Sequence, residues 1–280
     1  MNPNALSTKI IKKGMDFAYG SWANTQRMLG RIDYPVPSFS SMHKTSSKTV
    51  KHYYESGIRT AVPILTAARA NGLDLKQAKV LDFGCGVGRQ LAHMTRHLPE
   101  NEYYACDIDD LSVSFIQKHY EQVSAYVSSF RPPLAYEDAF FDMIYSVSIF
   151  SHLHLDDIEP WLQELARITK PGGLLMLTTE GPTALGPLSE AFGVSEAELL
   201  DELQAKGTLY KEYDYLEECL QKQGTLKSAS FMIGIEGSYG NTVLSPEHIH
   251  REWESDILEV VSVIEGIIDF RQDLVVLRRK

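Results

Sequence analysis

The ten residues 80–89 read VLDFGCGVGR, and they decide the fold of this chain. Apolar residues at the start of the stretch predict a buried strand, three glycines follow at alternate positions, and a helical pattern comes next. Glycine has no Cβ, so the backbone can turn sharply and approach a ligand closely. The following helix would direct unpaired N–H groups and its positive dipole end to the same place. The stretch therefore predicts a loop that binds a nucleotide-like cofactor.

The spacing of the glycines distinguishes two kinds of cofactor loop. A dinucleotide-binding loop follows the pattern G-x-G-x-x-G, which would place its third glycine where this chain has Arg89. The chain instead has Asp82 followed by Gly84, Gly86 and Gly88. This order resembles the first motif of the class I S-adenosylmethionine-dependent methyltransferases. The alternative is a glycine-rich turn between a strand and a helix that binds nothing.

The composition is that of an ordinary globular chain, with 44% hydrophobic and 23% charged residues among 280. No apolar run approaches the roughly 18 residues of a membrane span, and no signal-peptide pattern opens the sequence. The three cysteines are too few and too scattered for a disulfide framework or a zinc site. We therefore expect a cytoplasmic protein without stable membrane insertion.

The net charge of −10 is distributed unevenly. Residues 1–70 contain ten Lys and Arg against three Asp and Glu, and the remainder contains 17 against 34. An acidic body disfavours nonspecific nucleic-acid binding, so we expect no nucleic-acid partner. Because opposite charges attract, we expect the basic N-terminal part to dock on the acidic body. A membrane-surface role for an amphipathic N-terminal helix is the alternative.

Strands alternate with helices through the middle of the chain, which predicts a parallel sheet with helices on both faces. The predicted strands lie at 79–83, 102–106, 123–127, 140–146 and 174–179. Two further strands, at 257–263 and 272–277, are joined by only eight residues. A link that short suits an antiparallel hairpin and not a parallel crossover.

Three more segments resemble the same family in the expected order: YACD at 104–107, EDAFFDMIYS at 137–146 and LARITKPGG at 165–173. The resemblance implies an α/β, Rossmann-like methyltransferase fold with a seven-stranded, mostly parallel sheet and an antiparallel last strand. It also implies S-adenosylmethionine as the cofactor and S-adenosylhomocysteine as its product. Within the superfamily, SIFSHL at 148–153, YGN at 239–241 and QDLVVL at 272–277 are similar to bacterial enzymes of surface-glycan and natural-product pathways.

These patterns divide the chain into four parts. They are an N-terminal helical cap at 1–47, a donor-binding core at 48–180, an inserted helical lid at 181–240, and a helix and hairpin at 241–280 that complete the core. Within the lid, a capping box at Ser195 predicts one helix to Gly207, and a second helix is predicted from Tyr210 to Leu220. Capping signals also predict two helix starts in the core: Asp156 and Glu159 stand at capping-box spacing, and Ser245 precedes Pro246 at the first helical position.

The resemblance implies a donor site at the carboxyl ends of the parallel strands. Asp107 would accept the ribose hydroxyls, and Asp82 would order the glycine loop and bind the donor amino group. Simpler roles are a helix cap for Asp107, a turn cap for Asp82 and an exposed position for Arg59. The implied cofactor-binding residues are Arg59, Asp82, Gly84, Cys85, Gly86, Gly88, Asp107, Ile108, Ser129, Phe130, Ser146 and Val147.

Methyl transfer to a hydroxyl benefits from a general base, and His152 is the first candidate because of its suitable pKa. His154 is the second candidate. Tyr239 and Asn241 could orient the acceptor. The alternatives are a capping or core histidine and ordinary turn residues.

Two absences narrow the chemistry. The Asn/Asp-Pro-Pro-aromatic motif of amino-group methylases of nucleic acids does not follow the fourth predicted strand. That strand also lacks the carboxylate with which catechol-type enzymes bind Mg²⁺, and the histidines lack metal-ligand spacing. We therefore predict metal-independent O-methylation of a sugar or secondary metabolite, a small-molecule acceptor. N-methylation of a small amine, an inactive donor-binding module, and a homodimer all stay open.

Overall fold

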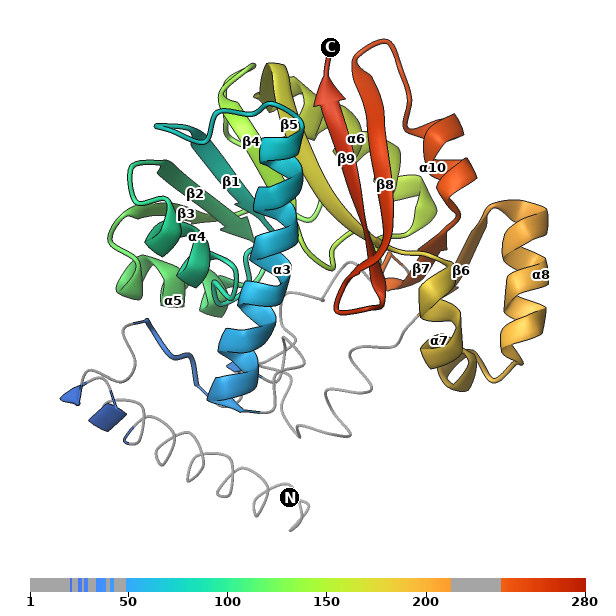
Figure 1. Ribbon diagram of the computed structural model, residues 1–280, viewed down its shortest axis with the longest axis horizontal. Coiled ribbons are helices and arrows are strands. Elements are labelled where there is room, and N and C mark those ends of the chain that lie inside the picture. The colour runs from blue at the N-terminus through green and yellow to red at the C-terminus, as the bar shows by residue number, and fades with distance from the viewer. Residues whose placement is uncertain are drawn as a thin grey trace.

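The computed structural model describes residues 49–212 and 238–280, together with 21, 25, 26, 28, 29, 34–38, 41 and 42 (Figure 1). The strands are β1 (Lys79–Phe83), β2 (Glu102–Asp107), β3 (Val123–Val127), β4 (Phe141–Ser146), β5 (Thr169–Glu180), β6 (Thr208–Glu212), β7 (Gly240–Leu244), β8 (Leu258–Ile268) and β9 (Gln272–Arg279). The helices are α3 (Val50–Ala70), α4 (Leu91–His97), α5 (Asp110–His119), α6 (Leu155–Ile168), α7 (Leu185–Phe192), α8 (Glu196–Lys206) and α10 (Pro246–Glu252), with a 3-10 turn at Pro182–Ala184.

Five parallel strands form the centre of the sheet in the order β3-β2-β1-β4-β5. Strand β9 pairs antiparallel with β5 on one side and with β8 on the other. The predicted α/β fold is therefore confirmed, including the antiparallel last strand and its hairpin. The order of the strands reverses between β1 and β4, which is where open α/β sheets bind ligands.

Two apolar layers cover the two faces of the sheet, and alternate residues of β4 pack into one layer or the other. Met143 and Tyr145 belong to one buried cluster, with residues of α3 and α4. Ile144 points to the other cluster, with α6 and α10. This alternation is the period of two expected of a strand that is buried on both faces. Figure 1 shows α3, α4 and α5 on one side of the sheet and α6 on the other.

Strands β6 and β7 were not predicted, and they correct the expectation of a seven-stranded sheet with a wholly helical insertion. β6 pairs antiparallel with β7, and β7 joins the end of β5 through Val243 and Glu180, which gives nine strands within the described residues. The helix predicted from Tyr210 is wrong over its first residues, and its remainder falls outside the described chain. The pairing partner lies beyond the predicted helix in sequence, and strand formation depends on such distant partners.

Helix α8 confirms the predicted capping box, because the Ser195 side chain accepts from Glu198 N and the Glu198 side chain accepts from Ser195 N. The Ser245-Pro246 start of α10 is also confirmed. By contrast, α6 starts with His154 as its cap, whose side chain accepts from Asp156 N. The capping role expected of Asp156 is therefore wrong.

Most of the proposed cap at 1–47 lies outside the described residues. Of its described part, Met42 is fully buried with Val50, Tyr53 and Val87, and Tyr34 stacks on Tyr54 at 4.2 Å between ring centroids. Within the described residues, no helix has both the length and the apolar character needed to cross a membrane.

Candidate donor and acceptor site

The glycine loop after β1 follows the course that its sequence predicts. Gly84 and Cys85 both donate from their backbone N–H to the carbonyl of Cys106, at 2.9 and 3.1 Å. Gly84 has φ +77°, and a Cβ on this residue would lie 2.3 Å from Cδ1 of Ile149. The position therefore admits only glycine, for its backbone conformation and for the close approach of the β4 loop.

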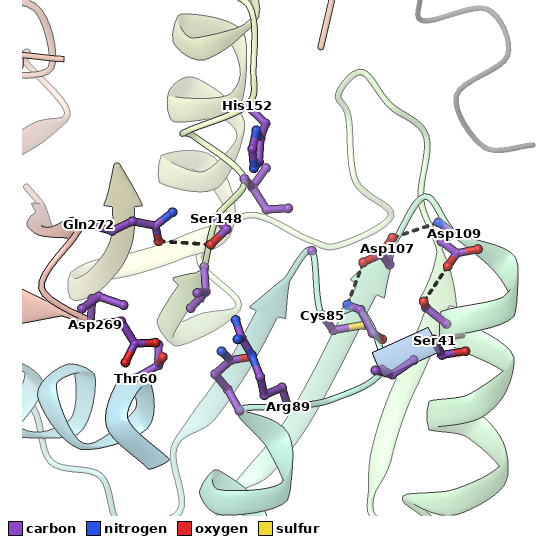
Figure 2. Close-up of a pocket in the computed structure, with 18 of the residues that line it drawn as sticks. Ser41, Thr60, Cys85, Arg89, Asp107, Asp109, Ser148, His152, Asp269 and Gln272 are labelled. Atoms are coloured by element: carbon purple, nitrogen blue, oxygen red, sulfur yellow. Dashed lines mark hydrogen bonds between the residues drawn. The ribbon is translucent and has the colours of Figure 1, made fainter. Parts of the chain in front are cut away.

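A cavity of about 460 Å³ lies at the carboxyl ends of β1, β2 and β4, beside the β8–β9 turn (Figure 2). The structure brings several of the residues proposed from sequence to its wall: Gly84, Cys85, Gly86, Asp107, Val147, His152 and Tyr239. It leaves others outside the lining: Arg59, Asp82, Gly88, Ile108, Ser129, Phe130, Ser146 and Asn241. One cavity thus joins the glycine loop to the candidate base.

Asp107 is held against the glycine loop. One of its carboxylate oxygens accepts from Gly86 N at 2.7 Å, and the other accepts from Asp109 N at 2.9 Å. Asp109 is the residue that caps α5, through hydrogen bonds from Leu111 N and from the Ser112 hydroxyl. Asp107 therefore does not serve as the helix cap, and its carboxylate is positioned at the wall of the cavity.

Asp82 lies beneath the loop and not in the cavity. Its side chain is buried and accepts a 2.8 Å hydrogen bond from the Tyr145 hydroxyl. Burial raises the pKa of Asp82 to about 7, because the charged carboxylate loses its hydration. The carboxyl group of Asp82 is thus buried against Tyr145 and lies outside the cavity lining.

Of the two arginines near the loop, Arg89 lines the cavity and Arg59, the one proposed from sequence, does not. Arg59 is half-exposed and forms a 2.5 Å ion pair with Asp269 in the β8–β9 turn, outside the cavity lining. Arg89 lines the cavity, and burial lowers its pKa. The sequence signal for Arg89 is its position directly after the third glycine of the loop.

Four further residues that the resemblance implied as cofactor-binding lie outside the cavity lining. Ser129 is exposed, Ile108 is half-buried, and Phe130 packs against the apolar layer that contains α6. Ser146 is fully buried at the end of β4, and its hydroxyl has no hydrogen-bond partner within the described residues.

His152 lines the cavity in a defined orientation. Its Nδ1 lies 2.8 Å from the carbonyl oxygen of Gly240, and its ring stacks on Tyr239 at 5.0 Å and 14°. A carbonyl can only accept, so Nδ1 carries the proton and Nε2 of the neutral ring keeps its lone pair. Burial lowers the pKa of His152, which favours this neutral form at neutral pH.

The segment around Gly240 builds this orientation. Gly240 N donates to the His152 carbonyl at 2.8 Å, and Tyr239 forms a bridge with Leu153. His154, the second candidate base, caps α6 and is not among the lining residues. Asn241 lies in β7 opposite Lys211 and is also outside the lining.

A polar group that sequence reasoning missed forms another part of the lining: Ser148, Glu180, Arg271 and Gln272, here called the polar wall. Figure 2 shows Ser148, Gln272 and His152 on one side of the cavity, and Asp107 and Asp109 on the other. The sequence signal for the polar wall is weak, because Ser148 and Gln272 are 124 positions apart.

In the part of the chain that the structure describes, no group of three or more His, Cys, Asp and Glu side chains is arranged to hold a metal ion. The cavity lining offers the glycine loop, four acids (Asp107, Asp109, Glu180 and Asp269), two arginines, a neutral imidazole and several hydroxyl and amide groups.

Comparison with known proteins agrees with this geometry. A family model described as a methyltransferase domain matches residues 80–173, from β1 into β5. The solved structure of the PH0226 protein from Pyrococcus horikoshii has a TM-score of 0.53 and 18% sequence identity, and covers 81% of this chain and 91% of that chain. This likeness shows the shared fold.

Two relatives illustrate how far acceptors diverge. A malonyl-(acyl-carrier protein) O-methyltransferase of Herminiimonas arsenicoxydans is 33% identical over 141 residues, which are 46% of this chain and 51% of the relative. A tRNA N(3)-cytidine methyltransferase of Danio rerio is 27% identical over 112 residues, 37% of this chain and 32% of the relative. The chain thus spans about half of the first relative and a third of the second.

Proposed function

The chain carries a methyltransferase domain of the class I S-adenosylmethionine-dependent superfamily, and we propose that it transfers a methyl group to a hydroxyl of a small molecule. The observation that carries this proposal is the sharing of one cavity by the glycine loop, Asp107 and His152. The first two suit a donor, and the third suits the removal of a proton from an acceptor.

The cavity residues fit the donor. Gly84, Cys85 and Gly86 line the cavity, and their backbone would contact the donor's tail and ribose. Asp107 would accept the ribose hydroxyls, as acids at this position do in dinucleotide folds. Arg89 would bind the donor carboxylate through charge-assisted hydrogen bonds. S-adenosylmethionine supplies the electrophilic methyl group when bound.

His152 would prepare the acceptor. Its Nε2 lone pair can take the proton of a hydroxyl, while the hydrogen bond from Nδ1 to Gly240 fixes the ring. The stack on Tyr239 limits rotation of the ring. The remaining rate enhancement would come from alignment of the acceptor hydroxyl with the donor methyl group and from exclusion of water.

The charge distribution supports a small acceptor over RNA. Residues 71–280 contain 17 Lys and Arg against 34 Asp and Glu, a net charge of −17. A nucleic-acid acceptor brings one phosphate per nucleotide, and such a body would repel it.

Calorimetry with S-adenosylmethionine and S-adenosylhomocysteine tests the donor part of the proposal. We expect one-to-one binding with micromolar affinity, followed by S-adenosylhomocysteine release when a panel of hydroxylated small molecules is added. Absence of binding to the folded protein would overturn the proposed function. Turnover of amines but not of hydroxyl compounds would show that the protein methylates nitrogen and not oxygen.

A further inference from the structure

The polar wall contains a buried carboxylate with one unused oxygen. Glu180 is the last residue of β5, is 1% exposed and lines the cavity. Arg271 donates a hydrogen bond from Nε to its Oε1 at 2.7 Å, and Nη2 of Arg271 lies 2.5 Å from the same oxygen in the ion pair. Within the described residues, Oε2 of Glu180 has no hydrogen-bond partner.

This arrangement differs from a usual arginine–carboxylate pair. Two parallel hydrogen bonds normally engage both carboxylate oxygens, whereas here Nε and Nη2 of Arg271 both approach the same oxygen. A buried acceptor that lacks a donor costs free energy. Burial also raises the pKa of Glu180, with Arg271 acting in the opposite direction. A ligand that donates a hydrogen bond to Oε2 would remove this cost.

The neighbouring side chains are held in place. Gln272 Oε1 accepts from the Ser148 hydroxyl at 3.1 Å and from the Thr178 hydroxyl at 3.0 Å, and its amide nitrogen donates to the Ser151 hydroxyl at 3.3 Å. These hydrogen bonds fix the orientation of the Gln272 amide, with its oxygen toward Ser148 and Thr178 and its nitrogen toward Ser151. Thr178 also accepts from Ser148 N at 2.8 Å.

Ser148 adopts a backbone conformation that is unfavourable for its residue type. Its φ is +61°, in the left-handed region that favours glycine. Such conformations persist where the surroundings enforce them, and they concentrate at ligand sites. Here the hydrogen bonds to the Thr178 and Gln272 side chains hold the backbone and the hydroxyl of Ser148 in place at the cavity wall.

The charge of the polar wall selects among ligands. Glu180 and Arg271 neutralise each other, and Asp269 of the same turn is paired with Arg59. An ammonium group would meet Arg271, and an anion would meet the unused oxygen of Glu180. A neutral hydroxyl group suits the site, because it both donates and accepts.

Resting on the proposed methyl transfer, we propose that the polar wall is the acceptor subsite and that it recognises a neutral molecule with adjacent hydroxyl groups, of the sugar or polyol class. One hydroxyl lies at His152 for methylation, and its neighbour donates to Oε2 of Glu180 and accepts from the Arg271 or Gln272 side chain. Glu180 is thus a specificity-determining residue of the acceptor site.

The test begins with the full chain saturated with S-adenosylhomocysteine. Saturation-transfer NMR would compare neutral polyols (myo-inositol and methyl glycosides of glucose, mannose and rhamnose) with primary amines and carboxylates of similar size. We expect binding of the polyols only. Removal of one particular hydroxyl from the best binder should weaken it about tenfold, the scale for a hydrogen bond to a charged group.

Glu180→Gln keeps the shape of the side chain and removes its charge. We expect it to weaken the parent polyol about tenfold, to leave the deoxy analogue nearly unchanged, and to preserve S-adenosylhomocysteine affinity. Glu259→Gln is the matched control, since Glu259 on β8 is a half-exposed carboxylate that pairs with Arg278 on β9 and lies outside the cavity lining. It should bind polyols as the wild type does.

Three outcomes would overturn the proposal while methyl transfer stands. The first is that no polyol binds the protein saturated with S-adenosylhomocysteine, and the second is that amines or carboxylates bind in place of polyols. The third is that Glu180→Gln shows the same difference in affinity between the parent polyol and its deoxy analogue as the wild type does. If Glu180→Gln does not fold, the affinities of the deoxy analogues for the wild-type protein still test the proposal. Affinities equal to that of the parent polyol for every deoxy analogue would contradict the subsite. Failure of the folded wild type to bind S-adenosylhomocysteine would instead reject the proposed function itself.

Discussion

The imidazole of His152 is bonded through Nδ1 to the carbonyl oxygen of Gly240, at 2.8 Å and across 88 positions of sequence. Because the carbonyl can only accept, this one contact determines which ring nitrogen carries the proton and which is available to an acceptor. It also explains why the Tyr239-Gly240-Asn241 segment matters. Its contribution to the site is the backbone carbonyl of Gly240 and the ring of Tyr239, with Asn241 outside the lining.

Replacement of His152 should abolish most turnover and spare donor binding. We expect His152→Ala to lower kcat by about 10²–10⁴-fold, the usual contribution of a general base, with unchanged calorimetric affinity for S-adenosylhomocysteine. His154→Ala is the control, because His154 caps α6 and lies outside the cavity lining. Equal losses in the two variants would contradict a catalytic role for His152.

The pH profile of kcat should report the same residue. Burial lowers the pKa of His152, so the base is neutral and active above that lowered value and is lost only when acidification protonates it. We expect a rate that is constant through neutral pH and falls below the ordinary histidine range. A fall that begins above the ordinary range would show that a different group titrates.

Substitution of Gly84 should damage both stability and donor binding. Gly84→Ala places a Cβ 2.3 Å from Ile149, in addition to its φ of +77°. Gly72→Ala is a matched control with φ +80° and no atom within 4 Å of the new Cβ. We expect about 1 kcal/mol of destabilisation for the control, a larger loss for Gly84→Ala in urea unfolding, and loss of S-adenosylhomocysteine binding for Gly84→Ala alone. Equal unfolding free energies would show that the close approach to Ile149 is unimportant.

Asp107 should contribute to donor affinity. Removal of its carboxylate in Asp107→Ala should weaken S-adenosylhomocysteine binding by roughly 1–3 kcal/mol, the scale for hydrogen bonds to a charged group. Asp110→Ala, an exposed acid in the first turn of α5, is the control and should bind as the wild type does. Undiminished affinity in Asp107→Ala, measured by calorimetry, would remove this residue from the donor site.

Asp82 should make stability decrease with rising pH. Its pKa is raised from 3.8 to about 7 in the folded state, so the folded protein binds the proton more tightly than the unfolded chain. The contribution of this group is complete below about pH 4 and is lost as pH rises to about 7. We expect the unfolding free energy of Asp82→Asn, relative to wild type, to improve between pH 5 and pH 8. A constant difference would indicate an unshifted carboxyl group.

Chelation tests the prediction that no metal takes part. Turnover should survive exhaustive treatment with EDTA followed by gel filtration. Loss of turnover that Mg²⁺ restores would overturn this prediction.

The structural elements that the sequence predicts correctly are those whose conformation depends on neighbouring residues in the chain. The strand and glycine loop at 80–89, the Ser195 capping box and the Ser245-Pro246 helix start all depend on neighbours within a few positions. The C-terminal hairpin followed from the short link between its strands. The start of α6 was misread because the histidine at 154, an uncommon cap, holds a position that the acid at 156 was expected to take.

Local pattern was therefore sufficient for the α/β architecture and for the position of the donor loop, since turns, caps and strand periodicity act over a few residues. The polar wall, by contrast, is assembled only in the folded chain. Ser148 meets Gln272 across 124 positions, and Glu180 meets Arg271 across 91. No periodicity links such residues. They meet because β9 inserts beside β5 and brings the β8–β9 turn to the end of the parallel strands, and only that packing joins them in one cavity.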